Sequence, residues 1–162
     1  MKKLAILFAA MMLICACGSQ RNSAAGSSQS TNTQVSAMSA GQGAGDALHK
    51  LYAQYKADGN KYDYKNLQNI LNTVSLVGNC ATLKDNYKNK SYLSEFGTGM
   101  IAGSLGLVTQ ANQERVTNSL VDMMRNNESV QEGSSQMKSN AAVAAQYAGA
   151  LSSLLSDFSE AQ

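Results

Sequence analysis

The sequence predicts an all-α protein, a compact bundle of about five helices that follows a disordered tether. The chain contains no proline, a residue that interrupts helices. It also lacks strand signals, because no Asn-Gly or Asp-Gly pair joins two β-branched stretches. Apolar side chains instead recur three and four residues apart from Gly45 to Gln162, a length typical of one domain.

The first helices are predicted from apolar stripes that end at glycines. The first helix ends before Gly59, and its stripe comprises Leu48, Leu51, Tyr52 and Tyr55. The second begins near Asp63 and stops at Gly78-Asn79, and its stripe comprises Tyr64, Leu67, Ile70, Leu71, Val74 and Val77. A short third piece continues the same spacing with Cys80, Leu83 and Tyr87.

Two more helices follow, each with a polar residue that can cap its first turn. Ser91 is the expected N-cap of a glycine-rich helix that reaches Val108. Asn112 is the expected N-cap of a helix that ends before Asn126-Asn127. The last helix is expected from about Ser134 to Phe158.

The last helix carries a heptad seam, with apolar and small residues at alternating spacings of four and three. The seam comprises Met137, Ala141, Ala144, Ala148, Leu151, Leu155 and Phe158. It favours either docking of the helix on its own bundle or contact with a partner helix. If a partner binds here, Ala144, Ala148 and Leu151 are expected in the contact.

The glycine-rich helix offers a second candidate surface. Gly99 and Gly103 form a small-xxx-small pattern with Gly106 nearby, and such a face lets another backbone come close. The run lacks the third glycine of a dinucleotide fingerprint and the Gly-Lys-Ser/Thr of a phosphate loop. The pattern therefore indicates tight packing inside the bundle or a glycine-zipper contact with a partner.

The N-terminus has the pattern of an export signal. Lys2 and Lys3 are followed by an uncharged apolar run that ends at Ile14. The run is too short to remain as a membrane span, which needs about 20 residues. We therefore expect the segment to be removed.

The end of this segment, Ile14-Cys15-Ala16-Cys17, resembles the lipobox of bacterial lipoprotein precursors. The resemblance implies cleavage after residue 16 and attachment of acyl chains such as palmitate to Cys17. More than one chain gives durable membrane binding. Gly18 stands where an Asp would favour inner-membrane retention, so the resemblance implies an outer-membrane anchor that faces the periplasm.

Three segments follow from these observations. Residues 1–16 are the expected signal peptide, residues 17–44 the lipidated cysteine with a disordered linker, and residues 45–162 the helical domain. The linker is predicted because it consists mostly of Ser, Gln, Asn, Ala, Gly and Thr, which bury little surface. Cys80 would then be the one unmodified thiol, and its apolar neighbours favour burial.

Composition excludes several function classes. Loss of Lys2 and Lys3 leaves 11 of the 13 basic residues beside 11 acidic ones, so no basic surplus favours nucleic acid. The single histidine, His49, excludes His-rich zinc sites, and we expect no metal and no cofactor.

The alternative of a periplasmic enzyme or binder acting on cell-wall glycan depends on Glu95 beside Phe96 and on six tyrosines near amide and lysine residues. These tyrosines are Tyr52, Tyr55, Tyr62, Tyr64, Tyr87 and Tyr92.

The domain is also similar to small helical lipoproteins of Bacteroides-type bacteria, in the stretch from Leu83-Lys84-Asp85-Asn86-Tyr87-Lys88 to Leu105-Gly106-Leu107-Val108. This resemblance implies no particular activity. The sequence therefore predicts a lipid-anchored envelope lipoprotein without catalytic activity, a structural or partner-binding module. Its expected partners are the membrane and an envelope protein, and its oligomeric state stays open.

Overall fold

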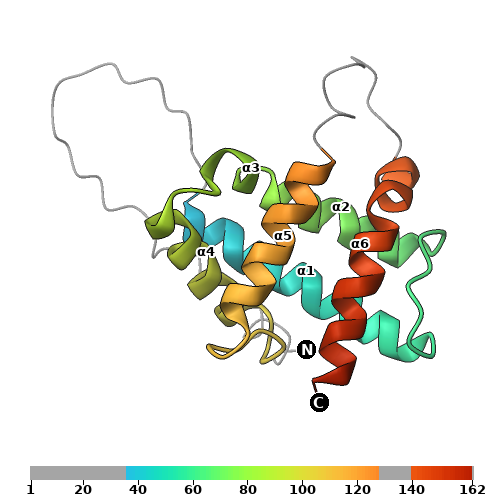
Figure 1. The fold of residues 1–162 in the computed structure, drawn as a ribbon. Helices are drawn as coiled ribbons and strands as arrows, with labels where there is room; N and C mark the ends of the chain where they lie inside the picture. Colours follow the sequence, from blue (N-terminus) through green and yellow to red (C-terminus); the bar gives the residue numbers. More distant parts are fainter. Residues whose placement is uncertain (1–35, 128–139, 162) are drawn as a thin grey trace, which may run out of the picture. The chain divides into compact units, whose positions relative to one another are not determined.

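The structure is a computed structural model that describes residues 36–127 and 140–161. The described residues form helices and turns without a strand, which confirms the predicted all-α class. Five helices are longer than one turn, and α3 is a single turn between two of them (Figure 1). The helices are α1 (Ala37–Ala57), α2 (Leu67–Cys80), α3 (Leu83–Asn86), α4 (Lys90–Gly103), α5 (Gln113–Asn126) and α6 (Asn140–Glu160).

The first helix begins earlier than expected, so the predicted boundary at residue 44 is wrong. Ser36 caps α1, because its hydroxyl accepts a hydrogen bond from the Ser39 N–H at 3.2 Å. The residues from Ala37 to Ala44 then form the first two turns. Their small side chains resemble a linker in composition, but several are buried against other helices, and this packing stabilises the segment.

Helix α1 lies between α2 and α4 and packs most extensively on α4 (Figure 1). A Cβ added at Gly41 would overlap the carbonyl oxygen of Phe96, and one added at Gly45 would overlap that of Met100. Reciprocally, a Cβ at Gly99 would overlap the carbonyl oxygen of Met38. The residue numbers rise together on both helices, so α1 and α4 run parallel. Two small-xxx-small faces therefore meet inside one chain, where backbone contacts backbone.

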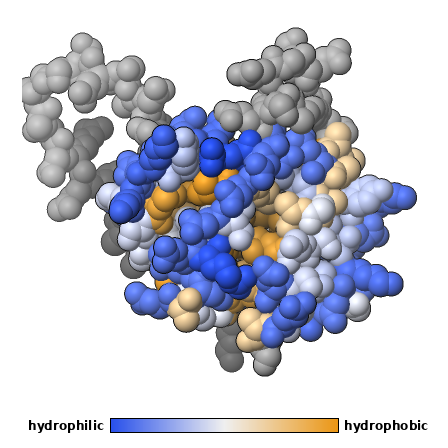
Figure 2. Space-filling view, viewed as in Figure 1, coloured by the Kyte–Doolittle hydropathy of each residue, from blue (hydrophilic) through white to orange (hydrophobic). Residues whose placement is uncertain are grey.

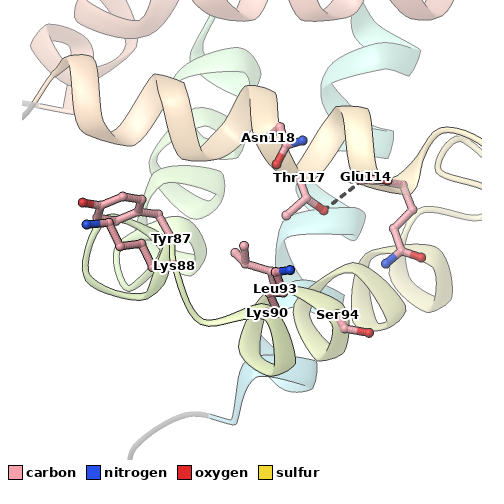
Figure 3. A pocket seen from close by; sticks show the side chains of 9 residues that line it. Tyr87, Lys88, Lys90, Leu93, Ser94, Glu114, Thr117 and Asn118 are labelled. Atoms are coloured by element: carbon pink, nitrogen blue, oxygen red, sulfur yellow. Dashed lines mark hydrogen bonds between the residues drawn. The ribbon is translucent and has the colours of Figure 1, made fainter.

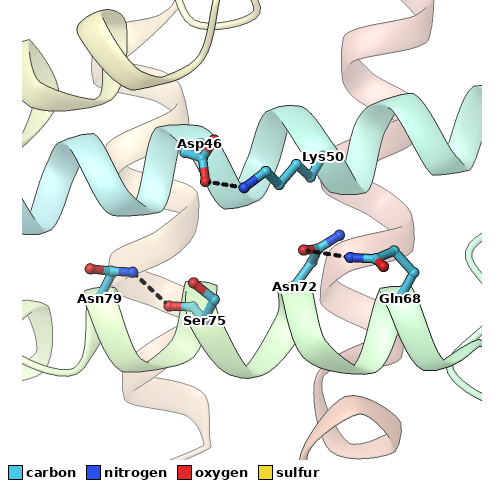
Figure 4. Close-up of polar contacts among 6 residues, drawn as sticks. All are labelled: Asp46, Lys50, Gln68, Asn72, Ser75 and Asn79. Atoms are coloured by element: carbon cyan, nitrogen blue, oxygen red, sulfur yellow. Dashed lines mark hydrogen bonds and ion pairs between the residues drawn. The ribbon is translucent and has the colours of Figure 1, made fainter. Parts of the chain in front are cut away.

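Helix α2 starts and ends later than its apolar stripe predicts. The Asn66 side chain caps it by accepting from the Gln68 N–H at 2.9 Å. The helix continues through Gly78 to Cys80, so the predicted stop at Gly78-Asn79 is wrong. In this last turn the Asn79 amide donates to the Ser75 carbonyl oxygen at 2.8 Å (Figure 4), so its polar group is satisfied within the helix.

Helix α4 is capped by Asn89 instead of Ser91, since the Asn89 side chain accepts from the Tyr92 N–H at 3.1 Å. The helix ends at Gly103, short of the expected Val108, because Leu105 and Gly106 take φ values of 49° and 91°. The buried Ser104 hydroxyl closes this turn by accepting from the Val108 N–H at 2.9 Å. Asn112 precedes α5 as predicted, but its side chain binds the turn instead, where it accepts from the Thr109 N–H at 2.8 Å.

The core of the described residues lies where the apolar stripes of α1, α2, α4, α5 and α6 meet. Cys80 is fully buried in it, and burial raises the pKa of its thiol well above the ordinary value. Leu151, Leu155 and Phe158 bring α6 into the same core. The expected start of this last helix near Ser134, with Met137, lies outside the described residues.

Candidate functional site

The structure places both predicted interaction surfaces mostly inside the fold. Gly99 faces α1, and a Cβ at Gly103 would overlap the carbonyl oxygen of Gln42, also in α1. Gly106 lies in the turn after α4, away from this face. The contact predicted for a partner is therefore made within the chain, because the small face of α4 is covered by the small face of α1.

The seam of α6 is likewise occupied. Ala144 and Leu151 are fully buried, and Ala148 is half-buried. Ala141 is exposed. The helix uses this face to dock on α2, α5 and α1, so the seam is a core contact and Ala144 and Leu151 are not available to a partner.

The described surface is hollowed at a different place, in a groove between the α3–α4 connection and α5. The groove has a volume of about 690 Å³. We call it the α4–α5 groove, and its lining residues are Tyr87, Lys88, Lys90, Leu93, Ser94, Gln113, Glu114, Thr117 and Asn118. Figure 3 shows Lys90, Leu93 and Ser94 on α4 opposite Thr117 and Asn118 on α5. On the face that carries α5, Figure 2 shows hydrophobic side chains recessed between hydrophilic ones.

Local structure fixes the two sides of this groove. The Asn89 cap starts α4 directly after Lys88, so the two lysines stand at the N-terminal end of the helix. On α5, the Thr117 hydroxyl donates to the Gln113 carbonyl oxygen at 2.8 Å. This bond uses the hydroxyl proton and leaves the oxygen free to accept a further hydrogen bond.

Cations dominate the Tyr87 end of the groove. The Arg125 guanidinium lies 4.3 Å from the centre of the Tyr87 ring, and the Lys88 ammonium lies 5.2 Å from it. Lys88 and Lys90 are exposed, and Glu114 is the acidic residue of the lining. The groove thus offers positive charge at one end, amides and hydroxyls along its walls, and the apolar Leu93 side chain. This combination suits a ligand with carboxylate groups and a short apolar part.

The features that favoured an enzyme do not converge. Glu95 is exposed on α4 and His49 is half-buried on α1. Among the described residues, no three His, Cys, Asp or Glu side chains are grouped as a metal site would require. The tyrosines are also dispersed: Tyr52 stacks on Tyr55 at 6.4 Å between ring centres, whereas Tyr87 lies at the groove.

Two further tyrosines have structural partners. Tyr62 shares a hydrogen bond with Thr73 at 2.6 Å, and burial raises the pKa of its phenol. The Tyr92 hydroxyl contacts the Thr82 hydroxyl. Tyr64 is exposed in the connection before α2. Six tyrosines therefore do not form one aromatic platform.

Sequence reasoning missed the α4–α5 groove because its residues come from separate elements and share no motif. The sequence signal that could have pointed to the groove is the pair of lysines Lys88 and Lys90, which flank the capping Asn89.

The predicted lipidation site, Cys17, lies outside the described residues. None of the helices in the described ranges has the length and hydropathy needed to cross a bilayer. Comparison of the chain with protein families, curated proteins and solved structures finds no match.

Proposed function

We propose that this chain is a lipid-anchored lipoprotein of the cell envelope whose helical domain binds a partner without catalysing a reaction. The lipobox-like Ile14-Cys15-Ala16-Cys17 supports the anchor, with Cys17 as the acylated residue. The outer membrane is the proposed location, with the domain facing the periplasm. The observation that carries the binding role is the α4–α5 groove, with its lysines, amides and hydroxyls.

The charge of the groove selects the partner. Lys88 and Arg125 lie against the Tyr87 ring, and the exposed Lys90 lines the same groove. An acidic segment of an envelope protein would place carboxylates on the lysines. Its backbone or amide groups would reach Asn118 and the Thr117 oxygen.

The anchor is tested by labelling cells with a palmitate analogue that carries an alkyne. We expect the wild-type chain and a Cys15→Ala variant to be labelled, and the Cys17→Ala variant to lose the label and leave the membrane fraction. Cys15 provides the matched control because it lies in the same motif, two residues earlier. Labelling of Cys17→Ala would refute acylation at this residue.

The binding role is tested by photo-crosslinking in cells. A photoreactive amino acid replaces Asn118 in the groove or Ser153, an exposed residue of α6, as the control. We expect one dominant adduct from position 118, absent from position 153, and lost when Lys88 and Lys90 become Glu. The same pattern of adducts from both positions would refute the assignment of the groove.

Binding of cell-wall glycan is a second candidate, favoured by the amides of Gln113 and Asn118 and by the hydroxyl of Ser94 along the groove. Stacking of a sugar on Tyr87 competes with the Arg125 guanidinium over that ring. Co-sedimentation with purified peptidoglycan separates the candidates. Sedimentation that Asn118→Ala reduces several-fold, without a protein adduct in cells, would favour the glycan.

A further inference from the structure

A run of exposed apolar residues begins just before α2 and continues along its outer face. The exposed fractions are 41% for Tyr64, 69% for Leu67 and 47% for Leu71. Leu67 and Leu71 are one helical turn apart on α2, and Tyr64 precedes them in the connection that leads into the helix. We call this strip the Tyr64–Leu71 surface. Leu105 and Met38 are also exposed, but each lies alone on another element, as is common for single apolar residues.

The rest of α2 explains why this strip faces outward. The helix turns its buried side toward the core with Leu76 and Cys80, and buries Asn69 and Thr73 on the same side. Because α1 and α6 pack on that side, the described helices leave the strip of Leu67 and Leu71 uncovered. Exposed apolar strips with charged borders mark interaction sites.

The border of the strip is cationic. Lys61 and Lys65 are exposed, and the Lys65 ammonium lies 5.8 Å from the centre of the Tyr64 ring. Asp63 is the acidic residue between them, and its carboxylate accepts the Lys65 backbone N–H at 2.9 Å. An aromatic ring, two leucines and two long cationic side chains match the interface of a bilayer with anionic headgroups, where the lysines reach phosphates and the apolar groups enter the acyl boundary.

We infer that the Tyr64–Leu71 surface contacts the anionic phospholipid bilayer to which the chain is tethered. The inference rests on the proposed acylation of Cys17, which would keep the surface close to lipid. The chain from Cys17 to Ser36 can span at most about 65 Å. Such a tether raises the effective concentration of the surface at the bilayer, so a weak contact suffices.

The absence of tryptophan from the chain permits a direct test with the mature chain, residues 17–162. A Leu67→Trp substitution adds a single fluorophore to the surface, and Ser152→Trp adds one to an exposed position of α6 as the control. Each chain is coupled through Cys17 to a maleimide phospholipid in vesicles of phosphatidylethanolamine and phosphatidylglycerol. Cys80 does not compete, because it is fully buried. Coupling makes the test independent of whether cells acylate Cys17.

Lipids with brominated acyl chains quench tryptophans that enter the bilayer. We expect them to quench the tryptophan at position 67 at least about twofold more than the one at position 152, together with a blue shift of its emission. Replacing Lys61 and Lys65 with Glu should remove most of this quenching. The Glu replacements lie at exposed positions, and circular dichroism verifies that the helices persist.

Equal quenching at both positions would overturn the inference and leave the acylation of Cys17 untouched. A blue shift at position 67 that depends on protein concentration, without lipid quenching, would assign the surface to a second copy of the chain and overturn contact with the bilayer. Failure of palmitate labelling in cells, with lipid quenching retained in vesicles, would instead refute the natural anchor.

Discussion

The parallel contact between α1 and α4 predicts that alanine destabilises this protein at some glycines and stabilises it at others. The perturbation is the double variant Gly99→Ala and Gly103→Ala. Each added Cβ would overlap a backbone carbonyl oxygen of α1, which cannot rotate away as a flexible side chain could. The matched control is Gly78→Ala with Gly149→Ala, two helical positions at which a Cβ would meet no atom within 4 Å.

The magnitudes follow from two opposing effects. Overpacking costs about 1–3 kcal/mol per site, and backbone obstacles place these sites in the upper half of that range. Alanine is better than glycine in a helix by about 1 kcal/mol. One separation of α1 from α4 relieves part of both overlaps, so the two sites together cost about 4–5 kcal/mol. The two alanines return about 2 kcal/mol, and the double variant should lose about 2–3 kcal/mol in total. In the control variant only the higher helix propensity of alanine acts, so its free energy of unfolding should rise by up to about 2 kcal/mol.

Urea and thermal unfolding of residues 17–162, followed by circular dichroism at the helical minimum, measure the stability of both variants. With a shift of about 4 °C per kcal/mol, the interface variant should melt about 8–12 °C lower than the parent and the control several degrees higher. An interface variant as stable as the control would refute the close parallel contact of α1 and α4.

Three further predictions concern single residues. Burial holds the Cys80 thiol protonated in the fold, whereas the thiol of the unfolded chain releases its proton above about pH 9, so the free energy of unfolding should fall as pH rises further. In Cys80→Ala this fall should be shallower by about 1.4 kcal/mol per pH unit. A pH profile that the substitution leaves unchanged would contradict the burial of the thiol. Ser104→Ala should lower the free energy of unfolding in urea by about 1–2 kcal/mol, because the buried Val108 N–H loses its acceptor. The control Ser94→Ala, at an exposed position, should stay within about 0.5 kcal/mol of the parent. Leu105→Asn should raise stability by about 0.5 kcal/mol, since asparagine tolerates the φ of 49° better than leucine, and a lower melting temperature would show that the exposed leucine makes a stabilising contact.

The helical class was predictable because large apolar residues in α1, α2 and α5 repeat at helical spacing. The start of α1 was not, since Ala37 to Gly45 have the small residues of a linker and become helical through contact with α2 and α4. The same limit applies to Gly99 and Gly103. Their spacing predicted a close backbone approach, but only the fold reveals that the approaching backbone belongs to α1.

The α4–α5 groove was beyond reach of the sequence for a different reason. It joins residues around Lys88 to residues around Asn118, and the hollow between them depends on how α4 and α5 are spaced. The cap of α4 is a related case: Asn89 and Ser91 are both residues that favour the N-cap position, and the structure places Asn89 there. A motif depends on local sequence, whereas a groove depends on packing.

The central position of α1 also has a mechanical consequence. A pulling force applied to the chain N-terminal to Ser36 enters the fold at Ala37, the first residue of that helix. Since α1 packs on both α2 and α4, a load along its axis must shear both interfaces before the helix can leave. The glycine contact resists this sliding, because carbonyl oxygens of each helix sit where the other has no side chains. A domain attached at its central helix bears load through its core, whereas one attached at a peripheral helix would unravel from its edge.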